Sequence, residues 1–299
     1  MLRGMSSTLS SLSGQLVAAV AAAARSVVAV EGSSRLPASG VLWRDGVIVT
    51  VDHGIKREEG LTITLPDGSS VAASVAGRDP GTDLAVLKSE TGVASIQPAD
   101  TAAAQPGAIV LAVGRAAEVG VHTGMGVISA VRGSWRTWRG GRIERYIRLD
   151  LAMYPGLSGS AVIDTEGRVI GVATSALSRI AGVAIPVETV DRVVDEVLKR
   201  GYVSRPYVGV GVQPVGGLPG GAGGLIIVSL EPQAPASVAG FLLGDILLSV
   251  GGKEVRSIGD LQDALQTWKV GDRVKVRLSR GAVERDIDLT LGERTKSAE

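Results

Sequence analysis

One serine in this sequence has the surroundings of a nucleophile. Ser158 lies between two glycines in the segment 155–159, PGLSG. A serine hydroxyl becomes an effective nucleophile only when a base accepts its proton and a third group orients that base. The sequence contains two histidines, His53 and His122, which are therefore the candidates for the base. The order of these residues along the chain decides which fold could use them.

Both histidines precede Ser158. The segment GLSGS is close to the Gly-x-Ser-x-Gly turn of α/β-hydrolases, but that fold needs the order serine, acid, histidine. The sequence therefore excludes an α/β-hydrolase. The order histidine, aspartate, serine remains, and this is the order found in the chymotrypsin double β-barrel.

Short apolar and β-branched runs fill residues 27–185, separated by glycine, aspartate and proline turns. This pattern favours a barrel or sandwich over alternating βαβ units. His53 follows the run VIVTV, and Asp83 precedes the run LAVLK, so we expect both at strand ends. There the Asp83 carboxylate can accept an imidazole N–H. We interpret His122 as a turn histidine outside the chemistry.

Three segments resemble the HtrA (Deg) family of trypsin-like serine proteases with a C-terminal PDZ domain. They are 79–88, DPGTDLAVLK, then 155–159, PGLSG, and 182–186, GVAIP. The resemblance runs from about Leu16 to Arg294. It implies a mainly β fold, in which a chymotrypsin-like double β-barrel protease domain is followed by a PDZ domain.

The resemblance also implies the roles of the site residues. His53 would be the general base and acid, Asp83 would orient it, and Ser158 would be the nucleophile. The backbone N–H groups of Gly156 and Ser158 would form the oxyanion hole. No cofactor is implied.

The sequence departs from the family pattern beside the nucleophile. Leu157 stands where the family has asparagine, and Ser160 and Ala161 stand where it has glycine and proline. The segment Gly54-Ile55 replaces a pair of valines after the histidine. None of these changes removes a reacting group, but Leu157 would alter the surface chemistry next to Ser158.

The resemblance places the S1 pocket around the residues that lead to Ser158. Ala152, six positions before the serine, would form its base, and its neighbours would be Val172, Ala173 and Ala184. No carboxylate is present among these residues to bind a basic side chain. We therefore expect small or medium apolar residues at P1.

We divide the chain into an N-terminal helical segment 1–26, a protease domain 27–201, a PDZ domain 206–294 and a polar tail 295–299. Apolar residues at helical spacing predict a helix over 187–200, and Gly201 is its stop signal. A second helix is expected from Ile258 to about Trp268. Ser257 and Asp260 resemble a capping box for that helix.

The resemblance assigns peptide binding to the second domain. PDZ domains bind extended C-terminal peptides by adding a strand to a sheet edge. Tyr207, Val208, Gly209 and Val210 would form the carboxylate-binding loop. Leu261, Ala264 and Leu265 on the second helix would form the other wall of the groove, or they would belong to the core.

Composition argues against several other partners. Lys plus Arg number 31 against 30 Asp plus Glu, so no overall charge attracts nucleic acid. The chain has no cysteine and two histidines, too few ligands for an ordinary zinc site, so we expect no metal.

The apolar run Leu16–Ala24 has nine residues, whereas a membrane span needs about 20, so we expect no transmembrane segment. This run is either a signal-peptide core or an N-terminal helix. The weakness of the signal favours the cytoplasm, while the resemblance allows the cell envelope.

The segment 131–148 contains six arginines and two tryptophans. Three interpretations are open for it: a solvated face, a regulatory or intersubunit contact at the position of the family's activation loop, and a polyanion-binding surface. A solvated hairpin would explain the arginines without any ligand.

We interpret the protein as a serine endopeptidase that cleaves unfolded or extended polypeptides through an acyl-enzyme. The resemblance implies a role in protein quality control, C-terminal peptides bound at the PDZ groove, and a homotrimer. The departures around Ser158 keep a second function open: a peptide-binding chaperone or adaptor whose protease scaffold is weakly active.

Overall fold

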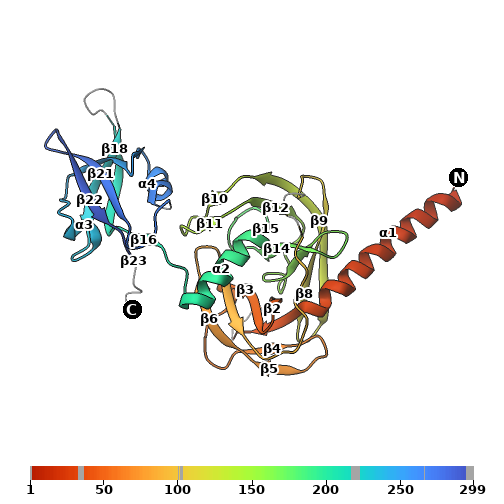
Figure 1. Cartoon of the computed structure of the whole chain (residues 1–299). Coiled ribbons are helices and arrows are strands. Elements are labelled where there is room, and N and C mark those ends of the chain that lie inside the picture. The colour runs from red at the N-terminus through yellow and green to blue at the C-terminus, as the bar shows by residue number, and fades with distance from the viewer. Residues whose placement is uncertain are drawn as a thin grey trace. The chain divides into compact units, whose positions relative to one another are not determined.

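Runs of β-branched and apolar residues form strands over most of the chain in the computed structural model (Figure 1). The structure describes residues 2–32, 37–99, 101, 104–216, 223–265 and 267–293, with side chains from residue 7 onward. The chain divides into two compact units, Met1–Val203 and Ser204–Glu299. The expected polar tail 295–299 lies outside the described residues.

The first sheet of unit 1 is antiparallel and has seven strands. In spatial order they are β5 (Ser70–Ala72), β4 (Thr62–Thr64), β1 (Val27–Glu31), β2 (Ala38–Arg44), β3 (Val47–Val51), β7 (Leu84–Lys88) and β6 (Ser74–Asp79). A short 3-10 turn, η2 (Asp52–Gly54), follows β3 directly. The chain therefore leaves β3 at the same end at which it enters its neighbour β7.

The second sheet closes into a barrel. Its strands, in order around the barrel, are β12 (Tyr146–Asp150), β15 (Val183–Pro186), β14 (Val169–Thr174), β13 (Ala161–Ile163), β8 (Ile109–Ala116) and β9 (Gly120–Arg132). Pairing of β9 with β12 closes the ring. A small hairpin, β10 (Trp135–Arg136) with β11 (Arg142–Ile143), lies in the connection between β9 and β12.

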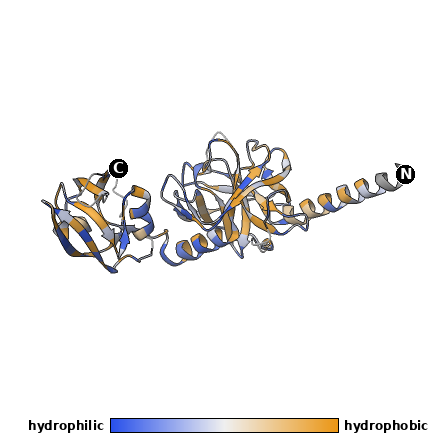
Figure 2. Ribbon diagram, turned by 90° about the horizontal axis from the view of Figure 1, so that it is seen from above, coloured by the Kyte–Doolittle hydropathy of each residue, from blue (hydrophilic) through white to orange (hydrophobic). Residues whose placement is uncertain are grey.

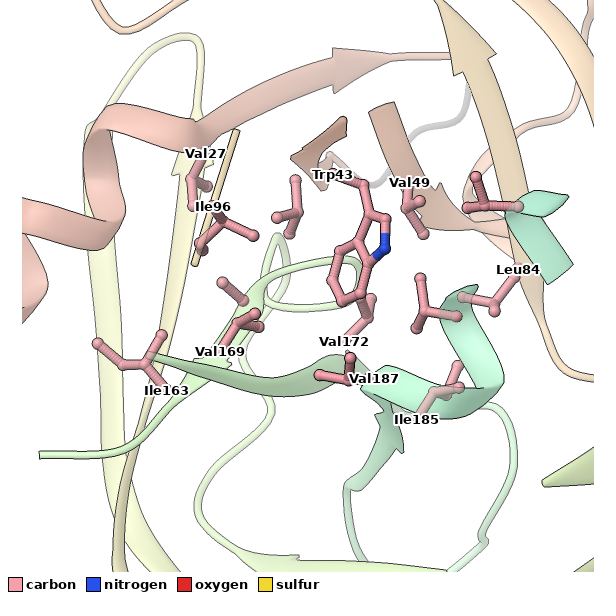
Figure 3. Close-up of a cluster of buried hydrophobic side chains, with 14 of the residues drawn as sticks. Val27, Trp43, Val49, Leu84, Ile96, Ile163, Val169, Val172, Ile185 and Val187 are labelled. Atoms are coloured by element: carbon pink, nitrogen blue, oxygen red, sulfur yellow. The ribbon is translucent and has the colours of Figure 1, made fainter. Parts of the chain in front are cut away.

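One buried apolar cluster joins the two sheets (Figure 3). Trp43 and Val49 of the first sheet share it with Val172 and Ile185 of the barrel. Two further clusters form the separate cores of the first sheet and of the barrel. The two halves of unit 1 are therefore held together by continuous apolar packing.

Helix α2 (Val187–Arg200) ends unit 1 where its periodicity predicted. Its valines enter the shared cluster, and its hydrophilic and apolar residues alternate in Figure 2. Gly201 caps the helix in the left-handed conformation, with φ of 82°. The indole N–H of Trp43 donates to Asp191 at 2.8 Å, which fixes the helix to β2.

Helix α1 (Leu2–Ala23) precedes the first sheet, and the 3-10 turn η1 (Ala24–Ser26) joins the two. Ala19 and Ala23 are buried in the shared cluster, while Leu9 and Val17 are exposed. The guanidinium of Arg115 binds the carbonyls of Ala24 and Val27 at 3.0 and 2.7 Å.

The helix that contains the apolar run Leu16–Ala24 is longer than the nine residues counted from the sequence. Over Ser7–Ser26 the helix is long and apolar enough to cross a membrane, by length and composition alone. Serines and leucines extend the segment beyond the nine residues counted from the sequence. A signal sequence near an N-terminus and a core helix meet the same criteria.

Unit 2 is a sheet with two short helices. The strands of the sheet, in order, are β17 (Val210–Val215), β18 (Gly224–Leu230), β19 (Ile246–Val250), β21 (Arg273–Arg280) and β22 (Val283–Thr290), and β20 (Lys253–Glu254) pairs with β19. β16 (Pro206–Tyr207) pairs with β23 (Gly292–Glu293). Val274, Val276 and Leu278 alternate inward along β21, as their spacing predicted.

The helices of unit 2 are α3 (Pro235–Val238) and α4 (Ile258–Leu265). The predicted capping box of α4 is confirmed: Ser257 Oγ accepts the Asp260 N–H, and the Asp260 carboxylate accepts the Ser257 N–H, at 3.1 and 2.8 Å. The helix stops before Trp268, earlier than expected. The Thr267 hydroxyl donates to the Ala264 carbonyl at 2.7 Å, and this contact accompanies the turn out of the helix.

A buried ion pair in unit 2 yields a stability prediction. Arg280 donates to both oxygens of Asp245 at 2.8 Å, and the Asp245 side chain is 1% exposed against 30% for Arg280. Arg280→Met leaves that carboxylate buried without its cation, so we expect the local unfolding free energy to fall clearly. Amide hydrogen exchange in β19 and β21 of the full chain measures it.

The control is Arg277→Met, which breaks the exposed pair between Arg277 and Asp286. An exposed pair contributes little to stability, so this variant should change the local unfolding free energy much less. Equal losses in the two variants would contradict the assigned role of burial.

Candidate active site

Strand pairing brings His53 and Asp83 together. Val51 at the end of β3 pairs with Leu84 at the start of β7. His53 lies two residues beyond one partner, and Asp83 lies one residue before the other. The Asp52 N–H also donates to the Asp83 carbonyl at 3.1 Å. The sheet register therefore sets the distance between the imidazole and the carboxylate.

The carboxylate of Asp83 is buried and accepts several hydrogen bonds. Its Oδ2 lies 2.8 Å from His53 Nδ1, and its Oδ1 accepts the backbone N–H of His53 at 3.1 Å. The Thr174 hydroxyl donates to Oδ2 at 2.5 Å. Asp83 has φ of 59°, an uncommon conformation for a non-glycine residue. These contacts fix the carboxylate and, through it, the orientation of the ring.

This environment changes the protonation of His53. The hydrogen bond to Asp83 raises the pKa of His53 above its ordinary value, and burial opposes that rise. The charges of Asp83 and Asp52 also raise this pKa, while that of Arg139 lowers it. The side chain is 34% exposed, so the ring remains accessible from solvent.

Arg78 holds the turn that carries His53. Its Nε donates to Asp52 Oδ1 at 2.5 Å, and its Nη2 donates to the carbonyls of Asp52 and Ile55 at 3.0 and 2.9 Å. Burial raises the pKa of Asp52, and the hydrogen bond from Arg78 opposes the rise. The guanidinium thus binds both ends of the turn around the histidine.

Ser158 lies in the loop between β12 and β13. Its carbonyl accepts the N–H of Ser39 in β2 at 3.0 Å, and the N–H of Gly159 donates to Ala173 in β14 at 2.8 Å. A Cβ at position 159 would lie 2.0 Å from the Ser39 carbonyl oxygen, so only glycine fits there. The loop is therefore seated directly against the first sheet.

The hydroxyl of Ser158 has a different partner from the expected one. Its Oγ lies 3.2 Å from Ser175 Oγ. Among the described residues it makes no hydrogen bond with His53. The structure therefore joins His53 to Asp83 but leaves the link between His53 and Ser158 open.

Two backbone donors near Ser158 are available. Within the described part of the chain, no hydrogen bond is formed by the N–H of Gly156 or of Ser158. The N–H of Leu157, between them, donates to the Tyr154 carbonyl at 3.0 Å. Gly156 has φ of 94°, which a residue with a side chain rarely adopts. The two free donors flank one that is used in the turn.

Leu157 does not alter the surface, contrary to the expectation from the sequence. It is fully buried, and its Cδ1 lies 3.3 Å from the position of a Cβ on Gly124. Ser160 and Ala161 are fully buried as well, and Ser160 Oγ has no hydrogen-bond partner within the described residues. Apolar packing therefore anchors the residue before Ser158.

The four residues expected around the S1 pocket do not share one environment. Ala173 and Ala184 are cross-strand partners in one buried cluster. Val172 lies in the cluster that joins the two sheets, and Ala152 is exposed. Neighbouring residues of a strand face opposite sides, which explains the separation of Val172 from Ala173.

The arginine- and tryptophan-rich segment forms the β10–β11 hairpin and its flanks. The Thr137 hydroxyl donates to the Gly81 carbonyl at 2.6 Å, two residues before Asp83. Glu144 accepts a hydrogen bond from Arg192 of α2 at 2.9 Å. The exposed ring of Trp138 stacks with the guanidinium of Arg139. The hairpin is therefore attached to the loop that carries the acid.

His122 is not a turn residue. It lies in β9, where it pairs with Gly114 of β8. Its Nε2 is buried and makes no hydrogen bond within the described part of the chain. Nε2 lies 3.1 Å from the position that a Cβ on Gly156 would take, so the ring packs against the loop that carries Ser158.

In unit 2 the loop expected to bind a carboxylate lies at one end of the edge strand β17. The carbonyls of Val208 and Gly209 accept the N–H groups of Ala236 and Glu231, each at 2.9 Å. The Tyr207 hydroxyl donates to Glu231. Leu261 and Ala264 of α4 are buried in the core of the unit, and Leu265 packs against it.

Sequence reasoning missed several supporting residues. Thr174, Ser39 and Arg78 contact the site only through the tertiary structure, and no local pattern marks them. The described residues contain no group of three or more histidine, cysteine, aspartate or glutamate side chains that could hold a metal ion.

Comparison with known proteins identifies both units. Residues 38–172 match the trypsin-like peptidase domain, and residues 206–291 match the PDZ domain. The chain is 32% identical over 280 residues to the serine protease Do-like HtrA of Lactobacillus helveticus, which covers 85% of this chain and 68% of that protein. It is 33% identical over 275 residues to the chloroplastic protease Do-like 1 of Arabidopsis thaliana, covering 85% and 63%.

A third relative, the putative serine protease HhoB of Synechocystis, is 30% identical over 259 residues, with 81% of this chain and 62% of that protein covered. The chain thus spans less than two thirds of the length of some curated relatives. A crystal structure of the serine endoprotease from Yersinia pestis superposes with a TM-score of 0.77 at 29% identity, covering 93% and 97% of the two chains. The HtrA-type protease AlgW with a decapeptide gives 0.79 at 25% identity, covering 93% and 98%.

These matches confirm the chymotrypsin-like protease fold followed by a PDZ domain. The chain belongs to the HtrA (Do-like) family of trypsin-like serine proteases that carry a PDZ domain.

Proposed function

We propose that the protein is a serine endopeptidase that uses His53, Asp83 and Ser158. The observation that carries this proposal is the 2.8 Å contact between His53 Nδ1 and the buried Asp83 carboxylate. This contact orients the ring so that its Nε2 is available to a nucleophile. The seating of the Ser158 loop against β2, next to the strand that leads to His53, supports the assignment.

In the proposed reaction the Ser158 hydroxyl rotates away from Ser175 and gives its proton to His53 Nε2. Its oxygen attacks the substrate carbonyl carbon, and the N–H groups of Gly156 and Ser158 stabilise the developing oxyanion. The imidazolium then protonates the leaving amine, and the C–N bond breaks. Water attacks the acyl-enzyme by the same route and releases the acid and the serine.

The substrates in this proposal are extended polypeptide chains. For the S1 region we keep Ala152, Ala173 and Ala184, and we leave out Val172 because it faces the cluster between the two sheets. None of them carries a charge, which supports a preference for small or medium apolar P1 residues. The juxtaposition of Ala173 and Ala184 on paired strands favours these two as wall residues.

We assign C-terminal peptide binding to unit 2. β17 has an unpaired edge in the described sheet, and the assigned segment Tyr207–Val210 runs from the end of β16 into the first residue of β17. The carbonyls of Val208 and Gly209 are bound within the unit, which favours an arrangement with the N–H side of the loop toward a terminal carboxylate. The proposal also includes a protease domain over 27–201 and a PDZ domain over 206–294. It further includes a homotrimeric assembly, which is inferred from the family.

A chaperone or adaptor function is the alternative. The contact between Ser158 Oγ and Ser175 Oγ favours it, because a hydroxyl held away from His53 is not activated. The two functions differ in whether Ser158 reacts with an electrophile.

Removal of the Ser158 hydroxyl distinguishes the two functions. Ser158→Ala removes the nucleophile, so we expect casein cleavage to fall by on the order of 10⁶ in kcat and labelling by a fluorophosphonate probe to vanish. Mass spectrometry should find the label of the unaltered protein on Ser158. Ser175→Ala is the matched control, because it removes only the partner of that hydroxyl, and labelling should persist or accelerate. An unaltered protein that takes no label would support the adaptor.

The second prediction concerns pH. Because Asp83 raises the pKa of His53, the neutral base should be lost as pH falls through a value above the ordinary 6.5. Asp83→Asn removes the hydrogen-bonded carboxylate, so the acid limb of kcat/KM should move to lower pH while kcat falls by about 10⁴. Profiles of kcat/KM against pH with a peptide ester measure both effects. The exposed Asp67→Asn is the control, and an acid limb that does not move in Asp83→Asn would refute the assignment.

The third prediction tests the loop of unit 2. A Cβ on Gly209 would lie 2.2 Å from Ala234 Cβ, so Gly209→Ala forces the loop to move. Overpacking costs about 1 to 3 kcal/mol. We therefore expect the Kd of a fluorescent peptide with a free apolar C-terminus to rise about tenfold or more. Fluorescence anisotropy measures it, with the amidated peptide as the ligand control.

Gly240→Ala is the matched protein control, since Gly240 also has positive φ, 85° against 80° at Gly209, but has nothing within 4 Å of its Cβ position. Equal affinity losses in the two variants would place the peptide elsewhere.

A further inference from the structure

The structure assigns Ser39 as a positioning residue for the loop that carries Ser158: its side-chain hydroxyl holds the Gly156 carbonyl while its backbone N–H holds the Ser158 carbonyl, and together they orient the Ser158 N–H between them. This inference rests on the proposed function and adds a residue to its machinery. Ser39 belongs to β2, in the other sheet, and is fully buried. It contacts the loop through both its backbone and its side chain.

Ser39 binds the carbonyls on either side of the peptide that joins Leu157 to Ser158. Its Oγ donates to the Gly156 carbonyl at 2.6 Å, and its N–H donates to the Ser158 carbonyl at 3.0 Å. The peptide between these two bound groups carries the N–H of Ser158, one of the proposed oxyanion donors. Fixing both neighbours restricts the rotation of that donor.

The direction of the Ser39 hydroxyl is itself determined. Its oxygen accepts the N–H of Arg115 at 3.0 Å, which occupies a lone pair and leaves the proton for an acceptor. The Gly156 carbonyl at 2.6 Å is closer than the alternative acceptor, the Arg115 carbonyl at 3.4 Å. In a buried site no solvent can replace a lost partner, so each bond matters more than at the surface.

The same residue is tied to the strand of the base. The Thr50 hydroxyl donates to the Ser39 carbonyl at 2.6 Å, and Thr50 lies in β3, three residues before His53. Ser39 is thus bonded to the strand that leads to the imidazole and to the loop that carries the nucleophile. The relative position of base, nucleophile and oxyanion donors depends on this contact.

The test compares two Ser→Ala changes at fully buried positions. Ser39→Ala removes a hydroxyl with two partners, while Ser160→Ala removes one that has none in the described structure. Loss of a direct oxyanion donor lowers kcat by about 10² to 10³. For a residue that positions the donors we expect Ser39→Ala to lower kcat about 10- to 100-fold with KM little changed, and Ser160→Ala to match the unaltered protein.

Two affinities separate positioning from general damage. A peptide boronate forms a tetrahedral adduct on Ser158, so its affinity should fall with Ser39→Ala by about the same factor as kcat. The Kd of a substrate peptide, measured in the Ser158→Ala background, should not change. The inference is overturned if boronate affinity and kcat are retained in Ser39→Ala, or if both decline no more than in Ser160→Ala.

Folding and the proposed function are checked in the same series. Where Ser39→Ala unfolds at the assay temperature, Ser39→Cys carries the test, because a thiol is a weak donor, and kcat should again fall about tenfold. A cysteine variant with full kcat would overturn the inference. If the unaltered protein neither cleaves casein nor takes the fluorophosphonate label, the proposed function itself fails. If the unaltered protein is active and Ser39→Ala leaves kcat unchanged, the role of Ser39 is refuted and the proposed function stands.

Discussion

The arrangement of the catalytic unit depends on the contact between one strand of the first sheet and one loop of the second. The N–H and hydroxyl of Ser39 bind the carbonyls of Ser158 and Gly156. β2, which carries Ser39, pairs with β3, and β3 leads to His53. The two sheets therefore carry His53 and the loop of Ser158, the proposed base and nucleophile, and the shared apolar cluster holds the sheets together.

Close approach across this contact dictates several residue types. Gly159 cannot carry a side chain, because its Cβ would meet the Ser39 carbonyl oxygen. On the acid side, Asp83 accepts an uncommon backbone conformation and is held by His53 and Thr174. Strain of this kind persists where surrounding contacts over-determine the conformation.

The pairing of His53 with Asp83, which are 30 residues apart, was predictable from the segments next to them. Each residue adjoins a recognisable apolar run, and the two runs pair at the ends where these residues lie. The order of histidine, aspartate and serine then identified the type of fold. The helix 187–200 was predictable for a similar reason, since its periodicity and its terminal glycine are both contained in the segment.

The remaining features depend on contacts between distant segments. Thr174 and Arg78 bind the site from strands whose sequences give no sign of it. His122 was interpreted as a turn residue, but it lies within the long strand β9. Alternation along β14 could have separated Val172 from Ala173, because it needs only the strand period of two. The partner of the Ser158 hydroxyl could not be inferred without coordinates.

The burial of Leu157 adds an apolar contact to the hydrogen bonds that hold the loop of Ser158. A leucine side chain carries no charge, so dissolved salt does not screen its contact with the barrel as it would screen an ion pair. Hydrophobic attachment instead weakens as water is cooled. This part of the attachment of the loop should therefore persist at high ionic strength and weaken at low temperature.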